Sequence, residues 1–230
     1  MGSANPTKMK INHCIFPENI LYDTENFVWA DIHHDKRKAI IGITSILGHI
    51  SGKLSAIKLS PVGSYIKRGK SCGTVESPRY FGVVRAPISG RVIETNNAII
   101  DQPKLANDLP YTEGWFAKFE ISNIDEELKN LQTIDSCYEK MYALIENHHI
   151  NCFSAFPDYE MFQIGVECAA TLAKLDELLE KITISNVVHL VSDDTTADLE
   201  MVRWSEQTGQ SLLETRKEGN LFHFIIKKMK

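Results

Sequence analysis

Hydrophobic residues in the first half of the chain occur in short runs that predict β-strands. Ala39–Thr44 is rich in β-branched residues, and apolar and polar residues partly alternate in Leu54–Leu59. The second run ends at Ser60-Pro61-Val62-Gly63, which is a typical turn sequence. Glycines punctuate the strands that follow, at Gly69, Gly73, Gly82 and Gly90. Many short strands with Gly and Pro at the bends predict a sandwich or flattened barrel from about Leu21 to Lys118.

The pattern becomes helical after this region and then breaks. Apolar residues recur at helical spacing from Asn123 to His148, with an interruption near Thr133. Residues 148–158 are predicted to be a linker. His148, His149 and Cys152 lie close together there, but no second pair with ligand spacing follows, so no metal site is predicted.

Residues 159–230 have a different pattern, in which strands and helices alternate. The predicted elements are a strand at Met161–Val166, a helix at Cys168–Ile182, a strand at Val187–Val191, a helix at Thr195–Gln207, and a hairpin of Gln210–Arg216 and Leu221–Lys227. The order β-α-β-α-β-β predicts an α+β two-layer sandwich. We therefore expect an N-terminal extension (1–19), a first domain (20–147), a linker (148–158) and a second domain (159–230).

Composition narrows the class of protein. Apolar residues make up 43% and charged residues 24% of the 230, as in ordinary globular proteins, and the net charge of −5 gives no support to nucleic-acid binding. No apolar run approaches the roughly 20 residues that span a bilayer, and the N-terminus has no apolar signal core. Five scattered cysteines without a CxxC pair argue against a disulfide framework or zinc site, so we expect a cytoplasmic protein.

The segment Gly69–Gly90 resembles the modification hairpin of the glycine cleavage system H protein. Val75-Glu76-Ser77 and Ala86-Pro87-Ile88-Ser89-Gly90 keep that family's frame without an insertion. Further similar motifs are Tyr22–Trp29, Gly42-Ile43-Thr44, Asn96-Asn97-Ala98, Asp101–Asn107 and Pro110–Trp115. The resemblance covers about residues 20–145. It implies the barrel-sandwich hybrid fold of lipoyl carriers, an all-β fold with C-terminal helices.

Arg79 stands where this family carries its lipoyl-lysine. A guanidinium stays protonated, so it cannot replace the amine that forms the lipoyl amide. No lysine lies between Lys70 and Lys104, and we therefore expect no lipoyl cofactor. Arg79, Tyr80 and Phe81 would instead be anchors for a partner protein, because Arg and aromatic residues dominate interface hot spots. The alternative is that Phe81 and Val83 pack on the sheet.

The second domain resembles the TusA-like sulfur-carrier family. The similar residues are Gly165-Val166-Glu167-Cys168, Asp193, Trp204, Gly209 and Phe222–Lys227, and the match covers about residues 159–230. The family's two prolines after the cysteine are absent from Cys168-Ala169-Ala170-Thr171. The resemblance implies that Cys168 accepts a persulfide. A cysteine at a helix N-terminus is favoured as the thiolate by the helix dipole. The alternative is a buried, inert cysteine.

These resemblances favour a carrier or binding protein over a catalyst. We expect a non-lipoylated H-protein-like adaptor fused to a sulfur carrier, with Cys168 as the persulfide acceptor. Its partners would be sulfur-transfer enzymes or enzymes of lipoate or glycine-cleavage systems, with no nucleic acid and no membrane. One alternative is a thiol-dependent sulfurtransferase, for which only the fold could bring His189 or His223 to Cys168 as a base. Another is a scaffold or regulator in which both sites are inactive.

Overall fold

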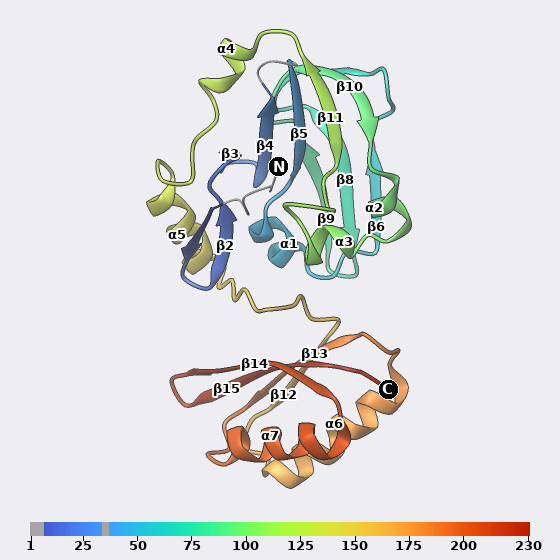
Figure 1. Cartoon of the computed structure of the whole chain (residues 1–230), viewed down its shortest axis with the longest axis vertical. Helices are drawn as coiled ribbons and strands as arrows, with labels where there is room; N and C mark the ends of the chain where they lie inside the picture. Colours follow the sequence, from blue (N-terminus) through green and yellow to red (C-terminus); the bar gives the residue numbers. More distant parts are fainter. Residues whose placement is uncertain (1–6, 34–36) are drawn as a thin grey trace, which may run out of the picture. The chain divides into compact units, whose positions relative to one another are not determined.

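The computed structural model describes residues 7–33 and 37–230 and divides into two compact units (Figure 1). Unit 1 is Met1–Cys152 and unit 2 is Phe153–Lys230. Among the described residues, no helix is both long and apolar enough to cross a membrane.

Unit 1 contains two larger sheets and a small hairpin, all of them antiparallel. The six-stranded sheet has the order β3 (Leu21–Asp23), β4 (Val28–His33), β5 (Lys38–Ile43), β11 (Ala117–Ile121), β10 (Gly90–Thr95) and β7 (Tyr65–Ile66). The three-stranded sheet is β6 (Ala56–Leu59), β8 (Ser71–Ser77) and β9 (Tyr80–Arg85). The apolar runs that predicted strands at 39–44 and 54–59 thus coincide with β5 and β6.

Alternate residues of both larger sheets build one apolar core. Ile41 and Phe119 of the six-stranded sheet are fully buried, and they belong to the same cluster as Ile57, Val75 and Val84 of the three-stranded sheet. Because side chains alternate between the two faces of a strand, the neighbours of these residues point away from this core.

Three short helices lie where the sequence pattern predicted only strands and turns. They are α1 (Ser45–Ser51), α2 (Asn97–Asp101) and α3 (Leu105–Asp108). Side-chain caps begin two of them, because Thr44 accepts a bond from the Leu47 amide and Asn96 accepts one from the Ala98 amide. Helices of seven residues or fewer are too short to show a helical period in the sequence. The predicted helical region contains α4 (Ile124–Leu128) and α5 (Tyr138–Asn147).

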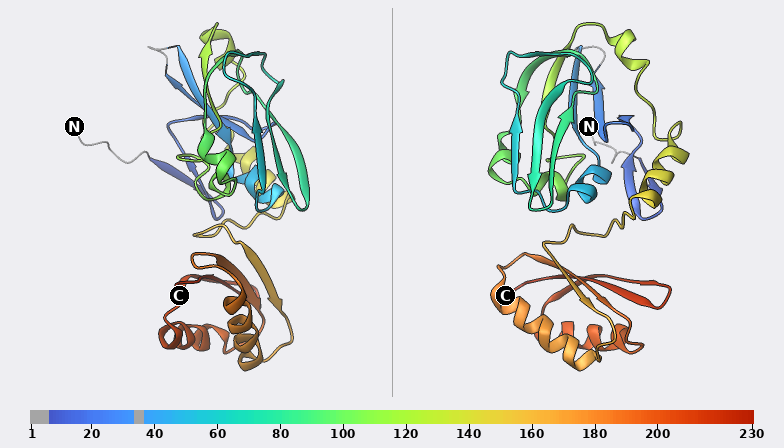
Figure 2. Two further views of the ribbon diagram at one scale, coloured as in Figure 1. Left: turned by 90° about the vertical axis from the view of Figure 1, so that its right-hand side faces the viewer. Right: turned by 180° about the vertical axis from the view of Figure 1, so that it is seen from behind.

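The described N-terminal residues, from Thr7 onward, pack against the rest of unit 1. β1 (Lys8–Ile11) and β2 (Cys14–Pro17) make a hairpin that lies beside α5 (Figures 1 and 2). Buried Ile11 and Phe16 pack in one cluster with Met141 of α5. The described part of the predicted extension at 1–19 therefore packs on the rest of unit 1, because its alternating apolar residues complete a second core.

A disulfide between Cys14 and Cys152 ties this hairpin to the end of unit 1. The sequence argued against disulfides, and the structure corrects this expectation. The two cysteines are separated by 138 residues, yet their Cα atoms lie 4.9 Å apart. Only the fold brings them together, so their spacing in the chain held no signal. The disulfide also removes the support that cysteine usage gave to a reducing compartment.

Unit 2 is a four-stranded sheet with two helices against one of its faces (Figure 1). The sheet order is β12 (Tyr159–Gln163), β13 (Val187–Ser192), β15 (Leu221–Lys227) and β14 (Ser211–Glu218), and only β12 and β13 are parallel. The helices are α6 (Cys168–Lys181) and α7 (Ala197–Thr208). Leu175, Leu190, Trp204 and Phe224 belong to the apolar cluster of this unit. The elements follow one another in the order that the sequence predicted.

Candidate functional site

The tip of the β8–β9 hairpin is fastened to the end of α1. Ser77 Oγ donates a hydrogen bond of 2.6 Å to the Ser51 carbonyl and accepts one of 3.3 Å from the Arg79 amide. Arg79 is exposed, and its guanidinium lies across Gly52: a Cβ atom at residue 52 would be 2.6 Å from Arg79 Nε. Gly52 has a φ of +73°, which residues with a side chain rarely adopt. The Ser77–Ser51 hydrogen bond and the position of Arg79 over Gly52 therefore hold the tip of the hairpin against the end of α1.

Half-buried His49 and buried Asn107 lie near this tip. Burial, with a smaller contribution from the Arg79 charge, lowers the pKa of His49 to about 4, so His49 is neutral near pH 7. Asn107 of α3 donates to the carbonyls of Gly48 and Gly52 and accepts from the Leu54 amide. Arg79 is exposed and presents a permanent positive charge at this tip.

The aromatic residues next to the tip have opposite orientations. Tyr80 is half-buried against the core of unit 1, and its ring lies where a side chain on Gly82 would be. Phe81 is 69% exposed, and Val83 on the same strand is 45% exposed. The alternative in which Phe81 and Val83 are packed is therefore wrong, because both side chains are exposed on the outer face of the three-stranded sheet.

Cys168 is the first residue of α6, as predicted, but its surroundings disfavour the thiolate. The side chain is 7% exposed, and the Cys168 amide donates a 2.8 Å bond to Asp194 Oδ2. The Gly165 amide donates to Asp193 Oδ1 in the same turn. Burial raises the pKa of the Cys168 thiol, and the carboxylates of Asp194 and Glu200 raise it further. The expected lowering of the pKa is therefore wrong in direction, because acidic side chains surround this helix end.

His189 and His223 bond to each other and lie away from Cys168. Their Nε2 and Nδ1 atoms are 3.0 Å apart, and both rings are buried. Val188 and Leu190, the strand neighbours of His189, pack in the cluster that α6 covers. His189 therefore faces the side of the sheet without helices, and neither ring can act as a base for Cys168.

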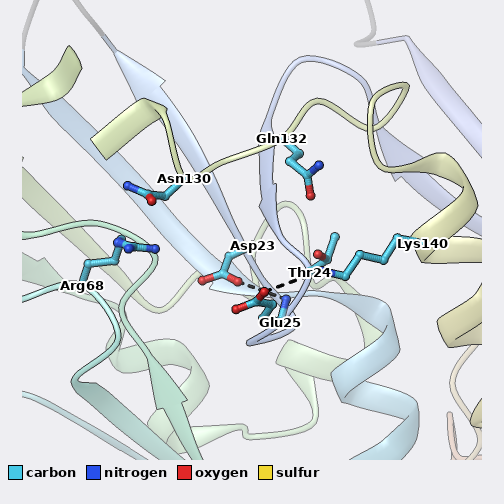
Figure 3. A pocket seen from close by; sticks show the side chains of 7 residues that line it. All are labelled: Asp23, Thr24, Glu25, Arg68, Asn130, Gln132 and Lys140. Carbon is cyan, nitrogen blue, oxygen red and sulfur yellow. Dashed lines mark hydrogen bonds and ion pairs between the residues drawn. The ribbon is translucent and has the colours of Figure 1, made fainter. Parts of the chain in front are cut away.

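A polar pocket of about 280 Å³ lies on unit 1 (Figure 3). In that view Arg68 and Lys140 lie on opposite sides, with Asp23 and Glu25 between them, while Asn130 and Gln132 complete the rim. The Asp23 carboxylate already accepts bonds from the Glu25 amide and from the backbone and side-chain N–H groups of Asn26. The positive charges of Arg68 and Lys140 offset the negative charges of Asp23 and Glu25, so the pocket favours neither an anionic nor a cationic ligand.

The pocket residues come from distant segments, so the sequence pattern did not reveal them. Among the described residues, no three His, Cys, Asp or Glu side chains gather as a metal site.

Comparison with known proteins places unit 1 in a recognisable group. The family profile described as "Glycine cleavage H-protein" matches residues 20–143. "Glycine cleavage system H protein 2" of Aquifex aeolicus is 37% identical over 139 residues, which is 60% of this chain and 86% of that protein. "Probable glycine cleavage system H protein" of Thermococcus gammatolerans is 39% identical over 124 residues, which is 54% of this chain and 91% of that protein.

A solved structure adds a further likeness. The crystal structure of a glycine cleavage system H protein from Mycobacterium marinum covers 59% of this chain and 100% of its own, with 26% identity and a TM-score of 0.47.

Proposed function

The chain belongs to the glycine cleavage H-protein family through residues 20–143, and from this membership we propose that unit 1 is a docking module that carries no lipoyl group. The observation that carries the proposal is Arg79 at the turn of the β8–β9 hairpin, in the frame where the family's lysine is expected. Its guanidinium cannot form the amide that attaches lipoate. Its position across Gly52 also gives it a structural role at the tip.

Lipoylation of the full chain tests this proposal directly. A lipoate ligase with lipoate and ATP should leave the wild-type chain unmodified, as judged by intact-protein mass spectrometry. Arg79→Lys restores an amine at the exposed turn and should gain the mass of one lipoyl group. Arg85→Lys, on the same strand and also exposed, is the matched control and should remain unmodified. A lipoylated wild-type chain would refute the proposal.

The partners proposed for this module are enzymes of glycine cleavage or of lipoate attachment. The names of the relatives point to the first group, and the resemblance of the hairpin to a modification site points to the second. Isothermal titration calorimetry of the full chain with each purified enzyme measures the interaction. An adaptor binds at least one of them without lipoate. If the chain binds none of these enzymes, the proposed adaptor role is wrong.

Sulfur carriage by Cys168 is the second candidate function. Its support is a cysteine at the first residue of a 14-residue helix, although the amides of Gly165 and Cys168 are already bonded to Asp193 and Asp194. The raised pKa of the thiol weighs against it. A cysteine desulfurase with cysteine as the sulfur source should add the mass of one sulfur atom to wild type and not to Cys168→Ser. If wild type gains no sulfur, unit 2 is better explained as a scaffold or regulator.

A further inference from the structure

Positive charge is concentrated in one part of an acidic chain. Residues 37–93 contain ten Lys and Arg residues and one acidic residue, Glu76, which gives a formal charge of +9. Because the whole chain has a charge of −5, the remaining residues carry −14. The cationic segment includes the whole three-stranded sheet and the turns that connect its strands.

The outer face of this sheet combines the cations with exposed apolar side chains. Lys58 of β6 lies opposite Thr74, which lies opposite Val83, so the three share one face. Phe81, Val83 and Arg85 alternate along β9 and therefore point to the same side. Phe81 is the most exposed large apolar residue in the described part of the chain, and Lys58 and Arg85 are also exposed.

β9 also forms an edge of its sheet. Among the described residues, β9 pairs with β8 and with no other strand. An edge strand offers unpaired backbone N–H and C=O groups to another chain, and proteins usually protect such edges. Phe81 and Val83 offer no such protection, because apolar side chains on an edge favour association.

We propose that β9 binds an acidic, extended segment of a partner protein as a fourth strand of the β6-β8-β9 sheet. Backbone pairing along β9 would provide affinity, as in β-strand addition. Phe81 and Val83 would contact apolar side chains of the added strand, and Arg85 on the same face of β9 would pair with one of its carboxylates. Arg85 donates one bond to the Gly69 carbonyl, and its guanidinium has five donors in all.

An acidic protein segment fits this surface better than the other occupants do. A second copy pairing through β9 would bring the cationic segment 37–93 of one chain close to the same segment of the other, which like charges disfavour. A nucleic acid would use the cations but would not need an apolar row on an edge strand. The inference rests on the proposed adaptor role of unit 1 and names the chemistry of the partner.

Nuclear magnetic resonance of the isotope-labelled full chain tests the inference with a defined probe. The probe is a short soluble peptide of alternating Glu and Val, and the backbone amides of Phe81 and Val83 should show the largest shifts. The same peptide with N-methylated amides on one edge should bind weakly, because it cannot pair. Phe81→Asp and Arg85→Glu should each weaken binding about tenfold. The matched controls Ile100→Asp and Lys129→Glu, which alter exposed residues of α2 and the α4 cap, should not.

Three results would overturn the inference. One is the absence of shifts on β9 with the Glu-Val peptide. Another is that an oligothymidine binds more tightly than the peptide, with an affinity that Phe81→Asp does not change. The third is a dimer of the full chain, detected by light scattering, that Phe81→Asp converts to a monomer. These readouts require neither lipoate nor a glycine-cleavage enzyme, so their failure is distinguishable from failure of the proposed adaptor role.

Discussion

Arg79 and Gly52 limit each other's substitution at the tip of the β8–β9 hairpin. The guanidinium occupies the space above Gly52 where another residue would place its Cβ atom, and the backbone of Gly52 has a φ of +73°. Arg79 therefore does more than remove a reactive amine from this position, because its side chain also packs on the end of α1.

Gly52→Ala should lower the free energy of unfolding by about 1–3 kcal/mol, because a φ of +73° strains a residue with a side chain, while the exposed end of Arg79 can move away from the added methyl. Urea unfolding of the full chain measures this loss. Gly63→Ala is the control: its φ is +93°, but no atom lies near the added methyl, so only the strain of about 1 kcal/mol remains. Arg79→Ala in the Gly52→Ala background should recover little of this loss, and a large recovery would show that the contact with Arg79 is what Gly52 avoids.

Burial raises the pKa of the Cys168 thiol most, and the carboxylates of Asp194 and Glu200 raise it further. Asp194 raises the pKa of the thiol, so Asp194→Asn should lower that pKa and increase the thiolate fraction. The rate of alkylation by iodoacetamide at pH 8 should rise roughly threefold, as followed by mass spectrometry of the peptide that contains Cys168. Asp193→Asn is the matched control, because Asp193 accepts from the Gly165 amide. Equal rates for the two variants would show that Asp194 does not set the pKa.

At the scale of elements, the paired histidines His189 and His223 lie on the face of the unit 2 sheet that has no helices. His189 of β13 and His223 of β15 stack at 5.2 Å, and Phe153 lies over both rings. Arg216 of β14 contacts Phe153, and Glu214 and Glu218 hold that guanidinium. The segment predicted as a linker at 148–158 is therefore partly ordered, because Phe153 packs on this face.

The histidine pair should make unit 2 less stable in acid. Burial lowers the pKa of His189 to about 4 and lowers that of His223, whereas unfolded histidine titrates near 6.5. The unfolded chain therefore binds more protons than the folded chain between these values, and stability falls as pH drops from 6.5 towards 4. We expect a loss of roughly 2–3 kcal/mol, since one pKa unit is worth about 1.4 kcal/mol.

Hydrogen exchange of β13 and β15 at pH 7 and pH 4.5 measures this loss, after correction for the intrinsic pH dependence of exchange. His189→Phe with His223→Phe should remove the difference between the two pH values. His148→Gln, at an exposed histidine of unit 1, is the control and should retain it. An equal loss in the double variant would assign the acid effect to carboxylates elsewhere.

At the scale of the whole molecule, the Cys14–Cys152 disulfide closes unit 1. It joins the β1–β2 hairpin to the last residue of the unit, and both cysteines share a buried cluster with Cys137. A crosslink over such a long separation restricts the unfolded chain strongly.

Reduction should lower the stability of unit 1 by about 2–5 kcal/mol and leave unit 2 unchanged. Hydrogen exchange with and without dithiothreitol measures this on the full chain, with Ile11 and Phe16 reporting on unit 1 and Phe224 on unit 2. Cys14→Ser with Cys152→Ser should already have the lower stability and should not respond to the reductant. A response of that variant would point to another effect of the reagent.

The sequence by itself determined the local elements and the family of unit 1. The run that became β5, the long amphipathic α6 and the order of elements in unit 2 were predictable, because periodic apolar residues reflect which side of an element is buried. The frame around Arg79 was also readable, since its motifs are contiguous in the chain.

The tertiary structure alone decided what depends on residues distant in the chain. It paired Cys14 with Cys152, placed Asp194 against Cys168, and turned Phe81 outward. A disulfide, a pKa and the exposure of a side chain are set by neighbours in space. No pattern of spacing along the chain specifies those neighbours, because the strands and helices between them decide which residues meet.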